Sequence, residues 1–149
     1  MTDLDSTLGD LSGARREGIF SSFWLAGFES ACHINLRRER LDMIASTQHD
    51  IQARDDYSRL ADLGITTVRD GVRWHRIERG KEFDLSSLAP MVDAAAERGI
   101  QVIWSLFHYG WPDDLDLFSP DFVPRFARYA GAVARLIADR VPEPPFYTP

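Results

Sequence analysis

The sequence contains a single cysteine, Cys32, among 149 residues. One thiol cannot form an internal disulfide, so no disulfide framework supports the fold and a reducing compartment is expected. There is no second cysteine for a CxxC pair, and the histidines show neither HxH nor HExxH spacing. We therefore expect no metal site in this chain, neither on thiolates nor on histidines.

Basic charge and long apolar runs are also scarce. Seventeen Lys+Arg face 23 Asp+Glu, a formal net charge of -6, and the basic residues form no long block, which disfavours nucleic acid or an anionic membrane as partner. The most apolar stretch, residues 100–107, is far shorter than the roughly 20 residues of a membrane helix. Residues 1–18 are polar and acidic, without the apolar stretch of a signal peptide, so a cytoplasmic location is expected.

Motifs that bind phosphate groups are missing. Neither GxGxxG nor GxxxxGK(S/T) occurs, and the turn after the first apolar segment reads Glu29-Ser30-Ala31-Cys32-His33. Dinucleotide binding is therefore disfavoured, and no cofactor is expected. With 44% hydrophobic and 27% charged residues, the composition is that of a globular domain able to bury a core, and small neutral ligands stay open as partners.

Apolar segments and helical periodicity alternate along the chain. Residues 19–28 predict a buried strand, and a helix beginning near Asp50 is stopped by Gly64. A strand at 65–69 and a helix capped by Ser86 and stopped by Gly99 follow. The remaining predicted elements are a strand at 100–107, a helix from Ser119 or Asp121, and the opening of a fourth strand at 146–148. This alternation predicts βαβ units around a parallel sheet, an α/β architecture.

Polar side chains follow each predicted strand. They are Glu29 and His33, then Arg69 and Asp70, then His108 and Asp113. In a (β/α)8 barrel the ligand site lies at the carboxyl ends of the strands, so these residues are expected to meet on one face. A barrel needs about 250 residues and eight strands. We therefore predict an incomplete barrel of about three to four βα units over 19–149, truncated before its fourth strand ends, after a polar tail at 1–18.

Three segments resemble glycoside hydrolase family 1, the β-glucosidase type of the clan A glycoside hydrolases. FWLAGFESACHI (23–34) resembles the family's first-strand segment, with His33 at the place of a sugar-binding glutamine. VRDGVRWHRIERG (68–80) resembles YRFSISWPRI, and SLFHYGWPDDL (105–115) resembles LxHWDLP, with His108 in register. The match spans roughly residues 23–149. It implies a fragment of a barrel enzyme that hydrolyses O-glycosidic bonds, with a carbohydrate as substrate.

The resemblance also implies roles for residues. His108 and His33 would bind sugar hydroxyls, and Arg69 would lie beneath the catalytic nucleophile and keep that carboxylate ionised. The family's acid/base and nucleophile glutamates are expected beyond Pro149, so no catalytic residue is assigned here and the chain alone is expected to be inactive. The other candidates are Glu29, Tyr109 and Trp111 for substrate binding and Asp70 and Trp74 for support of the site.

Structural roles compete with these functional ones. Large aromatic side chains mostly fill cores, and strand-end carboxylates such as Glu29, Asp70 and Asp113 commonly cap helices or pair with arginine. Departures from the family pattern, Gly110 for aspartate and His33 for glutamine, put the sugar preference in doubt. The alternative hypothesis is a non-catalytic half-barrel that binds carbohydrate or a partner chain, with possible self-association through its open sheet edges.

Overall fold

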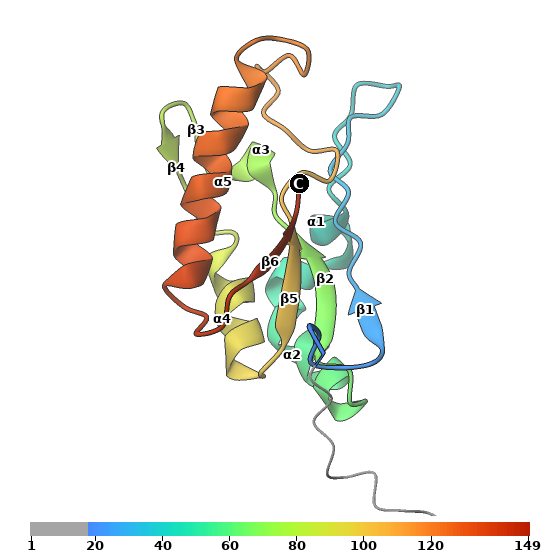
Figure 1. Ribbon diagram of the computed structural model, residues 1–149. Helices are drawn as coiled ribbons and strands as arrows, with labels where there is room; N and C mark the ends of the chain where they lie inside the picture. Colours follow the sequence, from blue (N-terminus) through green and yellow to red (C-terminus); the bar gives the residue numbers. More distant parts are fainter. Residues whose placement is uncertain (1–17) are drawn as a thin grey trace, which may run out of the picture.

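The computed structural model describes residues 18–149, so the predicted tail at 1–18 lies outside the described residues except for Gly18 (Figure 1). A parallel sheet forms the centre, with strand order β1-β2-β5-β6. Its strands are β1 (Leu25–Gly27), β2 (Thr67–Gly71), β5 (Gln101–Ser105) and β6 (Phe146–Thr148). The predicted α/β architecture with an unclosed parallel sheet is confirmed.

Helices connect the strands and cover one face of the sheet (Figure 1). They are α1 (Met43–Thr47), α2 (His49–Asp62), α3 (Trp74–Ile77), α4 (Ala89–Glu97) and α5 (Phe122–Ala138). An antiparallel hairpin of β3 (Glu78–Arg79) and β4 (Glu82–Phe83) follows α3. No helix within residues 18–149 combines the length and apolar character needed to cross a membrane. The short helices α1 and α3 and the hairpin were not predicted from the sequence.

The strand register assigns side chains to the two faces of the sheet. Arg69 pairs with Ile103, and Ile103 with Phe146, so these three side chains share one face. The alternating residues, including Val68 and Trp104, point to the other face and belong to the main hydrophobic core beneath the helices. In a barrel the helices lie outside, so the face of Arg69 is the one that lines the barrel interior.

Glycines end two helices as predicted. Gly64 after α2 and Gly99 after α4 adopt positive φ angles of 74° and 64°, which glycine tolerates without steric cost. The predicted cap at Ser86 is wrong, because α4 begins at Ala89 with Leu88 as its N-cap. Ser86 instead lies in a preceding turn, where its backbone N–H donates to the Asp84 carboxylate at 3.0 Å.

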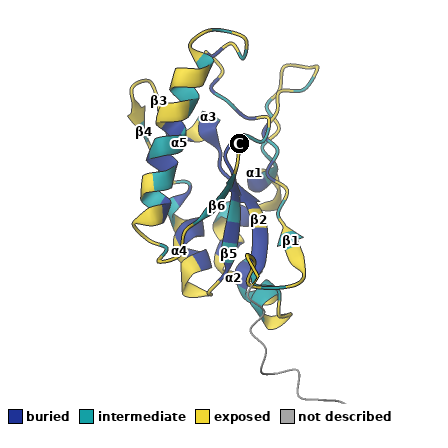
Figure 2. Ribbon diagram, viewed as in Figure 1, coloured by how far each residue is buried: buried dark blue, intermediate teal, exposed yellow. Residues whose placement is uncertain are grey.

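The prediction of a buried strand at 19–28 is wrong in extent and in burial. β1 has three residues, and Phe23, Trp24 and Leu25 are 75%, 72% and 47% exposed. The reason is that β1 is an edge strand, paired only with β2, so the neighbours that would bury its side chains are absent from residues 18–149 (Figure 2). The aromatic composition correctly predicted a strand, but it did not show whether other elements bury the side chains of that strand.

The segment before β1 is tied across the amino ends of the neighbouring strands. The Ser21 hydroxyl donates to the Thr66 carbonyl at 2.9 Å, and the Thr67 N–H donates to the Ser22 hydroxyl at 2.9 Å. Gln101 adds a third link by donating its amide to the Ile19 carbonyl at 3.1 Å. These contacts close one end of the sheet and leave the carboxyl ends of the strands for the candidate site.

A buried polar group joins α2 to β2. His49, 2% exposed, contacts Asp70 through Nε2 and Asp56 through Nδ1, both at 2.8 Å, and Tyr57 donates its hydroxyl to Asp70. Burial lowers the pKa of His49, but the two carboxylates raise it more, so the net shift is upward from 6.5. Protonation of His49 between the two carboxylates therefore stabilises the folded state.

The His49→Gln variant should lose one component of the pH dependence of stability. Because the folded-state pKa is raised, the imidazolium contributes stability that is fully present below pH 6.5 and is lost as the pH rises through the raised value. Urea unfolding across that range should show the wild type losing free energy of unfolding relative to the variant. The exposed His33→Gln variant serves as the control and should follow the wild type. Parallel curves for wild type and His49→Gln would contradict this assignment.

Candidate functional site

Three polar side chains gather where β1, β2 and β5 end. Glu29 follows β1, Arg69 lies on β2, and His108 follows β5. His108 Nδ1 lies 2.9 Å from the Ser30 hydroxyl and 3.8 Å from Glu29 Oε1. The Nδ1 atom is thus held by Ser30, and no contact within residues 18–149 engages Nε2, so this nitrogen is free to meet a ligand.

The charges of the cluster are coupled. Burial lowers the pKa of His108, Glu29 opposes this and Arg69 reinforces it, with a net lowering that favours the neutral imidazole. The Ala31 N–H, which donates to Glu29 at 2.9 Å, is the main cause that lowers the pKa of this carboxyl, and His108 and Arg69 contribute. The site therefore offers an anionic acceptor beside a neutral ring that can both donate and accept, the set that hydroxyl groups require.

Two glycines allow the segment after β1 to reach this position. A Cβ on Gly71 would lie 2.1 Å from Ser30 Cβ, and one on Gly110 would lie 2.5 Å from Cys32 Cβ. The approach is fixed by the Cys32 N–H, which donates to the His108 carbonyl at 3.0 Å. Glycine at these two positions therefore lets the loop after β1 lie against the ends of β2 and β5.

The remaining predicted substrate-binding residues have other environments. His33 is exposed and has no side-chain partner within residues 18–149. Tyr109, 62% exposed, adopts a left-handed φ of 59° and lies with its ring centroid 5.2 Å from that of His108. Trp111 is half-buried, donates its indole N–H to the Leu115 carbonyl at 2.9 Å and packs on Phe107.

The predicted supporting residues lie on both faces of the sheet. Arg69 is exposed on the face of the barrel interior. Asp70 is fully buried on the helical face, where it holds His49 and Tyr57, so it reaches the site only through the backbone of β2. Trp74 is also fully buried and donates its indole N–H to Glu78 at 2.7 Å.

The acidic residues after His108 have structural partners. Asp113 pairs with Arg40, Asp114 pairs with Arg125 at 3.1 Å, and Asp116 accepts the Phe118 N–H at 2.9 Å. Each of these carboxylates thus has an arginine or a backbone N–H as its partner, and for Asp113 this is the pairing with arginine that competes with a functional role. Neither Asp70 nor Asp113 contacts Glu29, so within residues 18–149 the structure does not bring a second carboxylate to the His108 cluster through these two residues.

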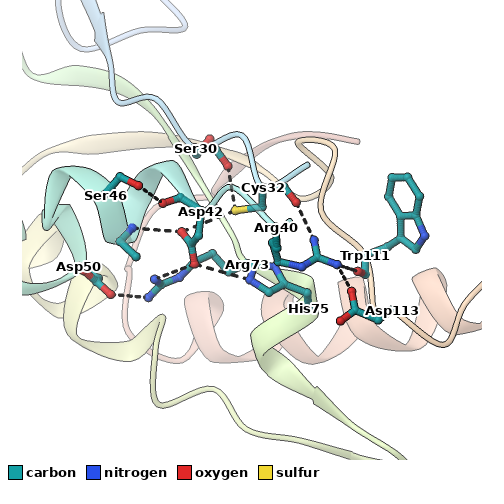
Figure 3. A network of polar contacts seen from close by, with 11 residues as sticks. Ser30, Cys32, Arg40, Asp42, Ser46, Asp50, Arg73, His75, Trp111 and Asp113 are labelled. Carbon is teal, nitrogen blue, oxygen red and sulfur yellow. Dashed lines mark hydrogen bonds and ion pairs between the residues drawn. The ribbon is translucent and has the colours of Figure 1, made fainter. Parts of the chain in front are cut away.

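A second polar network includes Cys32, in the loop after β1, together with Asp42, Arg73 and His75 (Figure 3). Cys32 Sγ lies 3.8 Å from Asp42 Oδ1, and Asp42 Oδ2 lies 3.4 Å from Arg73 and 3.5 Å from His75 Nε2. Burial raises the pKa of Asp42, but His75, the Ala45 N–H and Arg73 lower it more, and the net shift is downward. Burial, reinforced by Asp42, raises the pKa of Cys32 to about 12.

Sequence reasoning missed Ser30 and this second network. Ser30 lies in the quoted turn, but nothing in the residue pattern shows that Gly71 leaves room for it. Arg73 is buried, and its 2.7 Å contact with Asp50 provides the partner that its charge needs there. The contacts of Asp42 link segments up to 33 positions apart, a separation that local spacing does not register.

The fold and the position of the cluster define the class: this is the N-terminal portion of a (β/α)8 barrel, not closed within the described residues. No protein-family model matches the chain. In sequence, the chain is 30% identical to the coniferin β-glucosidase of Pinus contorta over 58% of its length. That alignment spans 19% of the plant enzyme, so the chain corresponds to a small part of it.

Solved structures give the same result. The chain is similar to the β-glucosidase BglU of Micrococcus antarcticus with a TM-score of 0.57 and 25% identity, over 67% of this chain and 22% of that one. It is similar to the virulence factor SghA of Agrobacterium tumefaciens, solved with its substrate analog salicin, with a TM-score of 0.59 and 25% identity. That match covers 67% of this chain and 24% of SghA. The predicted resemblance to family 1 β-glucosidases is confirmed for this part of their barrel.

The Gly71→Ala variant should disturb the site and the fold together. The added methyl would overlap Ser30, and overpacking of this kind costs about 1–3 kcal/mol of stability. Urea unfolding should show this loss, and the NMR signals of the His108 ring should shift as its Ser30 partner moves. Gly27→Ala is the matched control, because its nearest neighbour atom would be 3.8 Å away. Equal stabilities of the two variants would contradict the close contact.

Proposed function

We propose that this chain is the sugar-binding N-terminal portion of a β-glucosidase-like glycoside hydrolase. The observation that supports this most directly is the cluster of Glu29, Arg69 and His108 at the carboxyl ends of three neighbouring barrel strands. A carbohydrate hydroxyl would be bound by His108 Nε2 and by the Glu29 carboxylate. Because ligands of barrel enzymes bind at this end, the position and the chemistry agree.

Hydrolysis needs more than this cluster supplies. A retaining glycosidase uses two carboxyl groups about 5 to 5.5 Å apart, one as acid/base and one as nucleophile. Glu29 accepts the Ala31 N–H and has its pKa lowered, which suits an acceptor of sugar hydroxyls better than a proton donor. We infer that both catalytic carboxylates come from barrel units outside these 149 residues, where the family resemblance puts them.

Arg69 then has a defined task. It lies on the interior face of the sheet, exposed within residues 18–149, and its guanidinium carries a positive charge. A carboxylate brought against it by the missing strands would be kept ionised, as a nucleophile requires. The exposed His33 and the aromatic rings of Tyr109 and Trp111 are further candidates for sugar contacts, since aromatic faces stack on the apolar face of a pyranose.

The His108→Ala variant should lose affinity for a β-glucoside. Removing the imidazole takes away one of the two groups that contact hydroxyls, and a loss of about three- to tenfold corresponds to one ordinary hydrogen bond. Saturation-transfer NMR of the 149-residue chain with methyl β-glucoside measures this. Sorbitol, a polyol without a pyranose ring, is the control ligand. Equal signals for both ligands, or an unchanged affinity in the variant, would remove His108 from the proposed site.

The exposed edge supports a second candidate, a non-catalytic half-barrel that completes its sheet by association. Phe23, Trp24 and Leu25 lie exposed on and before β1, which has a free edge within the described part of the chain. A free strand edge with apolar side chains is a template for pairing with another chain. A second chain would cover these side chains and the unpaired backbone groups of β1.

Association predicts a concentration-dependent mass. Sedimentation equilibrium should show the wild type forming dimers or larger species, while Trp24→Lys, which adds a charge at the edge, should shift the equilibrium toward monomer. The exposed Val123→Lys on α5, away from the sheet edge, is the matched control. A wild type that stays monomeric at all concentrations while binding the glucoside would favour the hydrolase-fragment proposal over this one.

A further inference from the structure

The second network contains three potential metal ligands that the candidate sugar site does not use. Cys32, Asp42 and His75 each offer one ligand atom, and these atoms all lie within 4.8 Å of one another. They come from three places in the chain: the loop after β1, the N-cap of α1 and helix α3. Figure 3 shows the thiol, the carboxylate and the ring converging from these separate elements. We propose that this cluster is a binding site for a soft or borderline divalent cation of the Zn²⁺ type.

The spacing of the ligand atoms suits such an ion. Zn²⁺ binds thiolate sulfur at about 2.3 Å and nitrogen or oxygen at about 2.0–2.2 Å, so a tetrahedral arrangement separates the ligand atoms by about 3.3–3.6 Å. Cys32 Sγ lies 3.8 Å from Asp42 Oδ1, and His75 Nε2 lies 3.5 Å from Asp42 Oδ2. These two distances involve different oxygens of Asp42, and all three ligand atoms lie within 4.8 Å of one another, so side-chain rotations that move them by up to about an ångström would place the three on one ion.

The second nitrogen of the His75 ring is buried without a partner in the described part of the chain. His75 is 11% exposed, and its Nδ1 atom is buried with no hydrogen-bond partner within residues 18–149. A buried polar atom without a partner is unfavourable, and a ligand or a bound water is the usual explanation. A Cβ built on Gly110 would lie 3.4 Å from Nδ1 and 2.5 Å from Cys32 Cβ, so the unsatisfied ring nitrogen borders the cysteine. When Nε2 binds the ion, Nδ1 carries the ring proton and needs an acceptor of its own, which a bound water would supply.

Arg73 is positively charged and contacts Asp42, yet the local charges still allow a cation to bind. Arg73 is held at 2.7 Å by Asp50 and only at 3.4 Å by Asp42, so Asp50 neutralises it when Asp42 turns to the metal. On binding, the S–H bond of Cys32 breaks, its proton goes to solvent and a thiolate–metal bond forms. The thiolate and the Asp42 carboxylate then neutralise the divalent ion. Thiolate with imidazole selects zinc-like ions over Ca²⁺ or Mg²⁺.

The sequence predicts no metal site, because it contains none of the short, regular spacings of Cys and His that are typical of metal ligands. The ligands here are separated by 10 and 33 positions, and folding alone brings them together. Metal binding would also tie the loop after β1 to α1 and α3, and this loop carries Glu29 and Ser30. The ion would therefore fix the loop that carries Glu29 and Ser30 without itself contacting a sugar bound at the candidate site.

Co²⁺ titration of the chelator-treated, reduced 149-residue chain tests the proposal. The wild type should bind one Co²⁺, with the near-ultraviolet band of a thiolate–cobalt bond and the visible bands of a four-coordinate ion, and Zn²⁺ should displace it. Cys32→Ser should abolish the near-ultraviolet band. His75→Gln should weaken binding by more than about tenfold, the effect that loss of even a supporting residue has at metal sites. His33→Gln, beside Cys32 but exposed, is the matched control and should bind as the wild type does.

Thermal unfolding gives an independent readout. Saturating Zn²⁺ should raise the melting temperature of the wild type and of His33→Gln, and not that of His75→Gln, because a ligand that binds the folded state stabilises it. A folded wild type that binds no Co²⁺, or a thiolate band that persists in Cys32→Ser, overturns the proposal. So does a loss of binding in His33→Gln with none in His75→Gln.

Discussion

The candidate site depends on the absence of side chains at Gly71 and Gly110. These two positions let the loop after β1 lie directly on the ends of β2 and β5, with an added Cβ at 2.1 and 2.5 Å from Ser30 and Cys32. Everything else at this end follows from that contact. The Ser30 hydroxyl contacts the His108 ring, and Glu29 lies within 3.8 Å of that ring. Cys32 is buried with its Sγ atom 3.8 Å from Asp42 Oδ1. One steric condition thus shapes both polar clusters.

The side chains of β2 alternate between the face of the sheet that the helices cover and the face that lines the barrel interior. Val68 and Asp70 face the helices, where Asp70 satisfies the buried His49 and Tyr57. Arg69 between them faces the barrel interior and stays exposed. A substitution at Asp70 therefore alters a buried, hydrogen-bonded group, whereas one at Arg69 alters an exposed side chain on the interior face. The two neighbours were both predicted as supporting residues, and the structure gives them different environments.

Local signals in the sequence predicted most of the fold. Gly64 and Gly99 marked helix ends, the β-branched and aromatic segments marked strands, and the alternation of the two implied a parallel sheet. The prediction that residues 19–28 are buried was wrong. Their hydrophobicity indicates that burial would be favourable, but it does not show whether neighbouring elements are present to cover them. His108 and Glu29 could be predicted from strand ends and from resemblance. Ser30, Asp42 and His75 could not, since long-range packing alone brings them together.

The exposure of Trp24 has a spectroscopic consequence. Trp74 and Trp104 are 0% and 2% exposed and Trp111 is half-buried, whereas Trp24, which directly precedes β1, is 72% exposed. An indole in water emits at longer wavelength than one in an apolar core, so the edge strand contributes the red side of the protein's fluorescence. Quenching by iodide reaches Trp24 while leaving the core indoles bright. The chain therefore reports, without any label, whether its first strand is covered.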